Sequence, residues 1–232
     1  MRLFATQRRK LITLVVVITV LVAGGIGIYI LKPGRPVARF QPSDKNISPG
    51  QETIWNFDSD PVGGLPPGVE VYDGDWAVRA EEGAPTPPNA LCQTGSADFP
   101  AIAMSDRVYT DLEMSIRFKP VAGRDDQAAG IIFRVQDRDN YYILRANALE
   151  DNVIFFIYAS GKRTSIKESE VKVPSGQWQE LRVEVIGNKF RGFLNGQLVV
   201  EASDDNYKAG RVGLWTKADS VTCFDNVRVI SK

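Results

Sequence analysis

The chain of 232 residues carries 28 basic and 28 acidic side chains and contains no histidine. The absence of histidine excludes Ser-His-Asp and Cys-His catalysis and every histidine-ligated metal site. Seven of the basic residues lie within the first 39 positions, so the remainder has 21 basic against 28 acidic residues, and this balance gives no electrostatic reason to bind nucleic acid.

The most apolar part of the sequence is residues 11–31, an uncharged run of 21 residues that follows a basic segment at residues 1–10. At about 1.5 Å per helical residue this run reaches roughly 30 Å, the thickness of the hydrocarbon core of a bilayer. We therefore predict a single transmembrane signal-anchor helix. A cleaved signal peptide is the alternative, but no small-residue A-x-A cleavage site is evident.

The charges on either side of this run slightly favour an N-terminus inside the cytoplasmic membrane. The predicted location is therefore the cytoplasmic membrane, with one pass and with the C-terminal domain in the periplasmic or extracellular space. The opposite orientation is the alternative. Residues 32–51 are rich in proline, glycine, serine and charge and show no periodicity, which predicts an extended linker.

Residues 52–232 consist of short apolar runs separated by turn signals. A spacing of about eight to twelve residues between such signals predicts an all-β fold of two stacked sheets. Apolar and polar side chains alternate strictly in residues 112–118, as they do in a half-buried strand. The dipeptides Ser160-Gly161, Gly187-Asn188 and Asn195-Gly196 are typical of two-residue hairpin turns. No stretch of this part shows a sustained helical period.

Five stretches of this part carry a resemblance to a known family. In chain order they are IWNFDSDPVGGLPPG, DGDWAV, AAGIIFRVQDRDNYYILRANALEDNVIFFIYASGKR, SGQWQELRVEVIGNKFRGFLNGQ and AGRVGLWTKADSVTCFDNVRV. Their order resembles that of concanavalin A-like, or laminin-G-like, jelly-roll domains, and within these the domain family named for 3-keto-disaccharide hydrolases. The resemblance implies a two-sheet jelly-roll sandwich over residues 52–232. This architecture serves lectins, binding modules, adhesive domains and glycosidases alike.

Hydrolysis, which the name of the family implies, would need a pair of carboxylates. Retaining glycosidases on this fold typically place acidic residues two positions apart on one strand, because such side chains share a face and can flank the glycosidic bond. Asp111 and Glu113 share a face but lack a third acidic residue, and they are more simply interpreted as solvated. The sequence therefore assigns no catalytic residue and favours a binding domain over an enzyme.

Binding is better supported, because arginines occupy the interiors of two predicted strands beside aromatic and amide side chains. Proteins bind sugars with planar polar groups that contact hydroxyl pairs and with aromatic rings that lie against the apolar face of the ring. The alternative is that the arginines are solvated or paired with acidic residues and that the tryptophan is in the core. The predicted ligand-binding residues are Arg134, Gln136, Tyr141, Arg145, Asn152, Trp215 and Lys217.

A structural Ca²⁺ is implied by the same resemblance, because many jelly rolls of this kind hold one between the first and the last strand. The candidate ligands are Asp58 and Asp60 from one end of the domain and Asp225 from the other. Hard oxygen ligands suit Ca²⁺ and would tie the two ends together. Capping of turns by these aspartates is the alternative.

Cys92 and Cys223 are the two cysteines of the chain. In an exported domain an even pair favours a disulfide, which here would close a loop of more than a hundred residues. Two separate buried thiols are the alternative.

Together these features predict a membrane-anchored, extracytoplasmic carbohydrate-binding domain of the lectin type, without a catalytic pair of its own. Its expected partners are a glycan or cell-envelope polysaccharide and the lipid bilayer, which residues 11–31 would enter. A glycoside or 3-keto-glycoside hydrolase is the first alternative. A protein-binding adhesive or structural module is the second.

Overall fold

The computed structural model describes residues 18–22, 25–29 and 47–232. The chain divides into two compact units, Met1–Phe40 and Gln41–Lys232. In the first unit, β1 (Ile18–Val22) pairs antiparallel with β2 (Gly25–Tyr29). Both strands lie within residues 11–31, for which the sequence predicts a helix, and the rest of that run lies outside the described residues.

The described parts of this run therefore differ from the predicted helix. A short apolar run rich in β-branched valine, isoleucine and threonine has no period that separates a strand from a helix, and glycines such as Gly25 and Gly27 weaken a helix. Among the residues that the structure describes, no helix is long and apolar enough to cross a bilayer.

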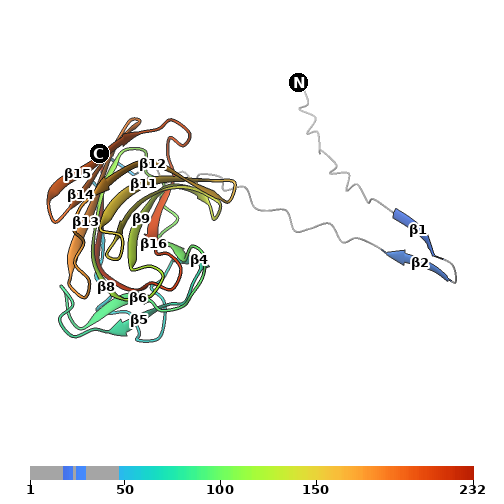
Figure 1. The fold of residues 1–232 in the computed structure, drawn as a ribbon, viewed down its shortest axis with the longest axis horizontal. Coiled ribbons are helices and arrows are strands. Elements are labelled where there is room, and N and C mark those ends of the chain that lie inside the picture. Colours follow the sequence, from blue (N-terminus) through green and yellow to red (C-terminus); the bar gives the residue numbers. More distant parts are fainter. Residues whose placement is uncertain (1–17, 23–24, 30–46) are drawn as a thin grey trace, which may run out of the picture. The chain divides into compact units, whose positions relative to one another are not determined.

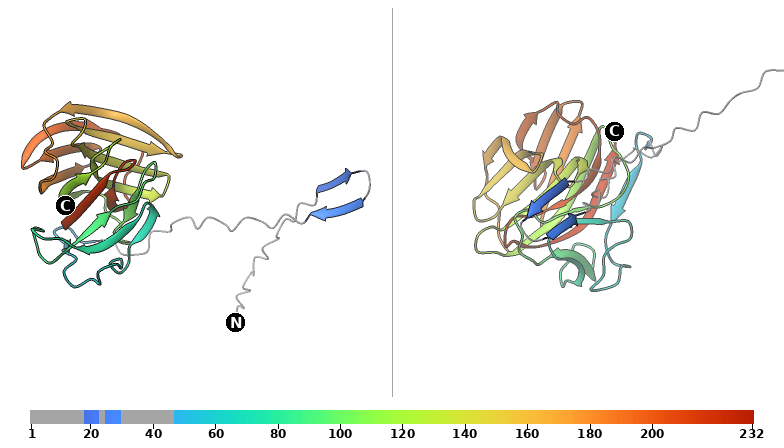
Figure 2. Two further views of the ribbon diagram at one scale, coloured as in Figure 1. Left: turned by 60° about the horizontal axis from the view of Figure 1, so that its bottom comes forward. Right: turned by 90° about the vertical axis from the view of Figure 1, so that its right-hand side faces the viewer.

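The second unit is an all-β sandwich of two antiparallel sheets, as predicted for residues 52–232, and Figure 1 and Figure 2 show its curved strands from three sides. One sheet has seven strands in the order β12-β11-β10-β9-β16-β7-β4. Its strands are β4 (Glu70–Asp73), β7 (Ala101–Ala103), β9 (Ala128–Asp137), β10 (Asn140–Asn147), β11 (Asn152–Ala159), β12 (Lys162–Glu170) and β16 (Arg211–Trp215).

The other sheet has eight strands, in the order β15-β14-β13-β8-β17-β6-β5 with β3 paired to β17. Its strands are β3 (Glu52–Trp55), β5 (Trp76–Ala80), β6 (Asn89–Gln93), β8 (Leu112–Ala122), β13 (Gln179–Ile186), β14 (Lys189–Leu194), β15 (Gln197–Ser203) and β17 (Val221–Ser231).

The main core lies between the two sheets, and β8 shows how the sequence builds it. From Leu112 to Pro120 its residues alternate between buried and half-exposed, and Leu112, Met114, Ile116 and Phe118 all point into the core. Each such side chain contributes about 1.5–3 kcal/mol when it leaves water, so the alternation also fixes the register of the strand.

Tight turns connect the strands where the sequence predicts hairpins. Ser160 and Gly161 join β11 to β12, and Asn195 and Gly196 join β14 to β15; all four have positive φ angles. Two central residues with positive φ define the turn type that matches the twist of paired strands, and glycine and asparagine adopt it at low cost. The first of these turns places β11 and β12 side by side at one edge of the seven-stranded sheet, next to β10.

A disulfide joins β6 to β17. Cys92 and Cys223 are direct cross-strand partners with a Cα–Cα distance of 4.0 Å, and their sulfur atoms are bonded. Trp178 packs against the pair. The bond links positions 131 residues apart, so it closes a large loop and removes chain entropy from the unfolded state.

Candidate functional site

The seven-stranded sheet has an outer face, turned away from the main core, that carries a second cluster of buried apolar side chains. A sheet face that meets only water normally carries polar residues, so a second aromatic layer here is unusual. Loop residue Phe99 and the half-buried Tyr72 of β4 pack against it. The largest members of the cluster on β9, β10, β11 and β16 are Ile132, Tyr141, Ile143, Ile154, Phe156, Tyr158 and Trp215.

One row of this outer face runs across three neighbouring strands. Arg163 of β12 is the cross-strand partner of Tyr158 on β11, which is in turn the partner of Tyr141 on β10. The two tyrosine rings lie 4.9 Å apart between centroids. A cation and two aromatic rings therefore stand in line at the end of the sheet where the β11–β12 turn lies.

Arg163 is held by aromatic rings rather than by a carboxylate. Its guanidinium carbon lies 5.0 Å from the ring centroid of Phe99, 4.5 Å from that of Phe156 and 5.6 Å from that of Trp215. Its Nη1 is buried and has no hydrogen-bond partner among the described residues. Desolvation, and then the charge of Arg145, lower the pKa of Arg163. The Nη1 donor of Arg163 therefore has no acceptor among the described residues.

A cavity of about 230 Å³, here called the tyrosine pocket, opens beside this row. The ring of Phe99 meets Tyr158 edge-on at 5.4 Å and stacks on Trp215 at 5.9 Å. The pocket therefore combines aromatic walls with carboxylates and one guanidinium. It is lined by Tyr72, Asp73, Asp98, Phe99, Arg138, Asp139, Tyr141, Tyr158 and Gly161.

The tyrosine hydroxyls of this pocket keep their protons at neutral pH. Desolvation raises the pKa of Tyr72 to about 12, although the positive charge of Arg211 opposes the shift. Desolvation also raises the pKa of Tyr141 and that of Tyr158. Protonated phenols can both donate and accept hydrogen bonds, which is what recognition of hydroxyl groups requires.

Trp215 and Lys217, two of the predicted binding residues, lie under and beside Phe99. Trp215 belongs to the outer-face cluster rather than to the main core, but Phe99 and Arg163 cover it and its exposed fraction is 0%. It packs over Gly130, where a Cβ atom would lie 3.3 Å from the tryptophan ring. The Nζ of Lys217 lies 3.4 Å from a carboxylate oxygen of Asp126.

Arg145 and Asn152 lie toward the other end of the outer face and are paired with acidic residues, as the alternative anticipated. Arg145 Nη2 donates to Glu150 Oε2 at 2.5 Å and to Asn152 Oδ1 at 2.6 Å. Asn152 Nδ2 donates to Glu150 at 3.2 Å and to Glu168 at 2.9 Å. Desolvation favours the neutral form of Glu150, but the charge and hydrogen bond of Arg145 outweigh it, so the pKa of Glu150 is lowered.

This network borders a shallow second cavity of about 420 Å³, here called the glutamate pocket. The β10–β11 turn provides one wall and the end of β12 provides the other. The lining residues are Glu150, Asp151, Asn152, Glu168, Glu170, Val171 and Lys172.

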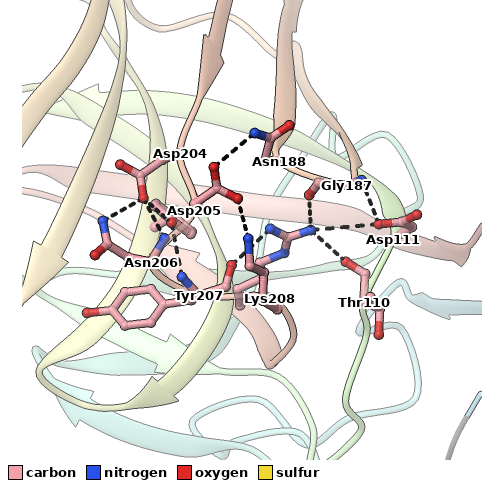
Figure 3. A network of polar contacts seen from close by, with 11 residues as sticks. Thr110, Asp111, Gly187, Asn188, Asp204, Asp205, Asn206, Tyr207 and Lys208 are labelled. Atoms are coloured by element: carbon pink, nitrogen blue, oxygen red, sulfur yellow. Dashed lines mark hydrogen bonds and ion pairs between the residues drawn. The ribbon is translucent and has the colours of Figure 1, made fainter.

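Arg134 does not join the other predicted binding residues. It is 1% exposed, its Nη1 donates to the carbonyl of Tyr207 at 2.9 Å, and its Nη2 donates to those of Thr110 at 3.1 Å and Gly187 at 2.5 Å. Asp111 lies 3.7 Å away. Figure 3 shows the surrounding network, with Thr110, Asp111 and Gly187 on one side and the Asp204–Lys208 loop on the other. The residue ties three loops together, so the structure gives it a role in the scaffold.

A β-bulge explains this outcome. Arg134 has a φ of 49°, and between Ile132 and Val135 two residues of β9 face a single residue of β16. The bulge shifts the alternation by one position, so Val135 reaches the outer face instead of sharing a face with Phe133. Gln136 caps the bulge by donating to the carbonyls of Arg134 and Ala209.

The residues predicted to bind metal lie near one another on the eight-stranded sheet. Asp225 is fully buried and accepts hydrogen bonds from the backbone nitrogen and the hydroxyl of Thr86. The Nδ2 of Asn89 points at the backbone carbonyls of Phe57, Asp58 and Asp60. Desolvation raises the pKa of Asp225 against these hydrogen bonds, and the charge of Asp58 adds to the increase. Within the described residues, no group of three or more acidic, cysteine or histidine side chains is arranged to hold a metal ion.

Comparison with known proteins now assigns the family. Residues 60–230 match the family described as the 3-keto-alpha-glucoside-1,2-lyase-like domain. The chain belongs to this family. The resemblance found in the sequence is therefore confirmed, and the jelly-roll sandwich is the fold that it implied.

Two relatives of this lyase-like domain come from Bacillus subtilis. Levanase of strain 168 is 27% identical over 165 residues, which make up 69% of this chain and 22% of levanase, so the chain spans about a fifth of that relative. The solved carbohydrate binding module CBM66 superposes with a TM-score of 0.61 at 25% identity, over 71% of this chain and 96% of the module. The Crh5 transglycosylase superposes with a TM-score of 0.51 at 12% identity, over 81% of this chain and 89% of the enzyme, a likeness that shows the fold alone.

A general acid in glycoside cleavage is a carboxyl group with a raised pKa close to the bond that breaks. Asp225 has a raised pKa but is buried on the eight-stranded sheet, whereas the pKa of Glu150, on the outer face, is lowered.

Two features of the outer face escaped the sequence analysis. Arg163 lies on an edge strand, and its role depends on the register that places it opposite Tyr158. Phe99 lies in a loop before β7, where no periodic pattern marks it. The sequence signal that could have indicated Arg163 is the two-residue turn, because it fixes which residues of β11 and β12 face each other.

Proposed function

We propose that this lyase-like domain binds carbohydrate on the outer face of its seven-stranded sheet and does not turn the ligand over. The observation that carries the proposal is the tyrosine pocket, where aromatic walls, carboxylates and the guanidinium of Arg138 converge beside the row that ends in Arg163. The similarity to a carbohydrate binding module at 25% identity supports the same conclusion.

The chemistry of the pocket fits a sugar. The rings of Tyr158 and Phe99 offer apolar surfaces for the faces of a sugar ring, and such contacts contribute beyond the area that they bury. Asp98 and Asp139 can accept hydrogen bonds from hydroxyl groups, and Arg138 can donate to them. A site that hydrogen-bonds hydroxyl groups on several sides discriminates among sugars by the positions of those groups.

The first class of glycan to test is the fructan levan, because the relative with 27% identity is a levanase. The full-length chain, purified in a detergent without a sugar headgroup, is titrated with levan, inulin, cellulose oligosaccharides and 3-keto-glycosides, and each mixture is then analysed for products. Saturable binding without product supports the proposal. Product formation would establish an enzyme, and the absence of both binding and product would favour a protein-binding module.

We also propose that residues 11–31 anchor the domain in the cytoplasmic membrane, with the domain on the outer side. The support is the length of the uncharged run, which as a helix matches the hydrocarbon core; the strands β1 and β2 lie within this run and would have to give way to that helix in a bilayer. Protease added to spheroplasts that express a C-terminally tagged chain should remove the tag. A tag that is protected until the cells are lysed would overturn this orientation, and a chain that fractionates with soluble protein would overturn the anchor.

A structural Ca²⁺ bound by Asp58 and Asp225, with Asp60 nearby, is a further proposal. The donor set fits a hard cation, because the buried carboxylate of Asp225 has no cationic partner within the described residues and Asp58 Oδ1 is buried without a hydrogen bond. The raised pKa of Asp225 means that its ionisation costs stability as the pH rises above the unfolded value. Ca²⁺ should therefore raise the Tm at neutral pH in the wild type but not in Asp225→Asn, and an equal response of both proteins would contradict the site.

A further inference from the structure

The glutamate pocket lies at the opposite end of the outer face from the tyrosine pocket. Tyr141 lines the tyrosine pocket, and Asn147, six residues further along β10, is the cross-strand partner of Asn152 in the glutamate pocket. At about 3.3 Å per strand residue the two pockets are separated by roughly 20 Å. A ligand that reaches both must be an oligosaccharide of several units.

The carboxylates of this second pocket are held in place by buried polar groups. Asn152 is 7% exposed and donates one hydrogen bond to each of Glu150 and Glu168, while Arg145, 2% exposed, orients both Asn152 and Glu150. Ordinary surface ion pairs need no such support and contribute little to stability. Burying an amide and a guanidinium on an outer sheet face is costly unless the groups are hydrogen-bonded, so the network indicates a preorganised pair of acceptors.

The charges of the pocket favour a neutral ligand. Glu150 is paired with Arg145, and Asp151 is paired with Lys172 at 2.7 Å. These two carboxylates therefore have cationic partners already and do not call for a metal ion. Glu168 and Glu170 would repel an anionic sugar. The hydroxyl groups of a neutral sugar fit this pocket, because they donate hydrogen bonds to carboxylates and bring neither a positive nor a negative charge.

We propose that the glutamate pocket is a second sugar subsite, which binds a later unit of the same neutral oligosaccharide whose first unit occupies the tyrosine pocket. The inference rests on the proposed function. Between the two pockets the ligand would cross the cationic groups of Arg163 and Arg145, which lie over Phe156. Glu168 is the acceptor to change, because it lies on an exposed edge strand and its removal leaves the Arg145–Glu150 pair intact.

The test is calorimetric titration of the full-length chain with levan oligosaccharides of two to six units, in a detergent without a sugar headgroup. In the wild type, affinity should rise with ligand length. Glu168→Ala should weaken binding of the six-unit ligand about tenfold, in line with the loss of a hydrogen bond to a charged group, and should leave binding of the two-unit ligand unchanged. Glu168→Gln should show the same pattern with a smaller loss.

The control is Glu201→Ala, which makes the same change at an exposed position of β15 on the other sheet and should leave both affinities unchanged. An affinity that does not rise with length, or a rise that persists in Glu168→Ala, overturns the second subsite and leaves the proposed function standing. Failure of the wild type to bind both short and long ligands overturns the proposed binding of levan and this inference with it.

Discussion

Arg134 and Arg163 both lie beside aromatic rings on the seven-stranded sheet, but they serve different purposes. Three carbonyl oxygens within 3.1 Å accept hydrogen bonds from the two terminal nitrogens of Arg134, although its Nε is buried without a partner, whereas Arg163 packs on aromatic rings and its Nη1 has no partner among the described residues. Buried polar groups are normally satisfied, so three backbone acceptors on the terminal nitrogens of Arg134 assign it to the scaffold, while Arg163 keeps a terminal nitrogen without an acceptor among the described residues. The comparison shows that burial of an arginine does not by itself mark a binding site.

The largest expected effect is on stability at Arg134. Arg134→Ala would leave the carbonyls of Thr110, Gly187 and Tyr207 without their donor, so we expect the free energy of unfolding to fall by about 3 kcal/mol. For a domain of this size that corresponds to a decrease in Tm of about 10 °C, measurable by calorimetry. Arg191→Ala, at an exposed position of β14, is the control. An unchanged Tm in Arg134→Ala would remove the distinction between the two arginines.

The next effect is on binding at Arg163. Arg163→Ala removes a cation that packs on Phe99, Phe156 and Trp215, so its Tm should fall by a few degrees, less than in Arg134→Ala, while the affinity for levan oligosaccharides falls at least about tenfold. Arg163→Lys should recover part of the affinity, because one donor returns without the planar guanidinium. A large loss of Tm with unchanged affinity would assign Arg163 to the scaffold instead.

Two tyrosines sharpen the same comparison. Tyr158→Phe removes a hydroxyl from the tyrosine pocket and should weaken binding about fivefold with little change in Tm. Tyr142→Phe removes the donor to Asp204 in the loop network near Arg134 and should lower the Tm while leaving affinity intact. Calorimetry and ligand titration of both variants test this prediction. A loss of Tm in Tyr158→Phe together with a loss of affinity in Tyr142→Phe would show that the binding region and the scaffold region are interchanged.

The smallest effect concerns pH. Because the folded pKa of Glu150 lies below its ordinary value of 4.5, its ion pair stabilises the fold above that pH, and this contribution is lost as the pH falls through the folded pKa. Glu150→Gln should therefore flatten the acid side of the Tm profile below pH 4.5. A variant profile that runs parallel to that of the wild type would show that Arg145 does not depend on this partner.

The sequence predicts the scaffold better than the site. Alternation in residues 112–118 and the turn dipeptides depend on local rules, so the strand and hairpins follow from them. The placement of Arg134 depends on a β-bulge, which the alternation of apolar and polar residues in the sequence does not indicate. Strict alternation therefore assigned Arg134 to the ligand-binding face, whereas the structure buries it. Arg163 and Phe99 form a site only through the register of an edge strand and the path of a loop, which single-sequence patterns do not contain.

The most direct test of the central claim is hydrogen exchange of the full-length chain with and without a saturating levan hexasaccharide. If the outer face of the seven-stranded sheet binds the glycan, exchange should slow in the loop at residues 95–99 and in the turns at residues 137–139 and 160–161. Slowed exchange confined to the turns of the eight-stranded sheet, at residues 186–188 and 195–197, would contradict the account.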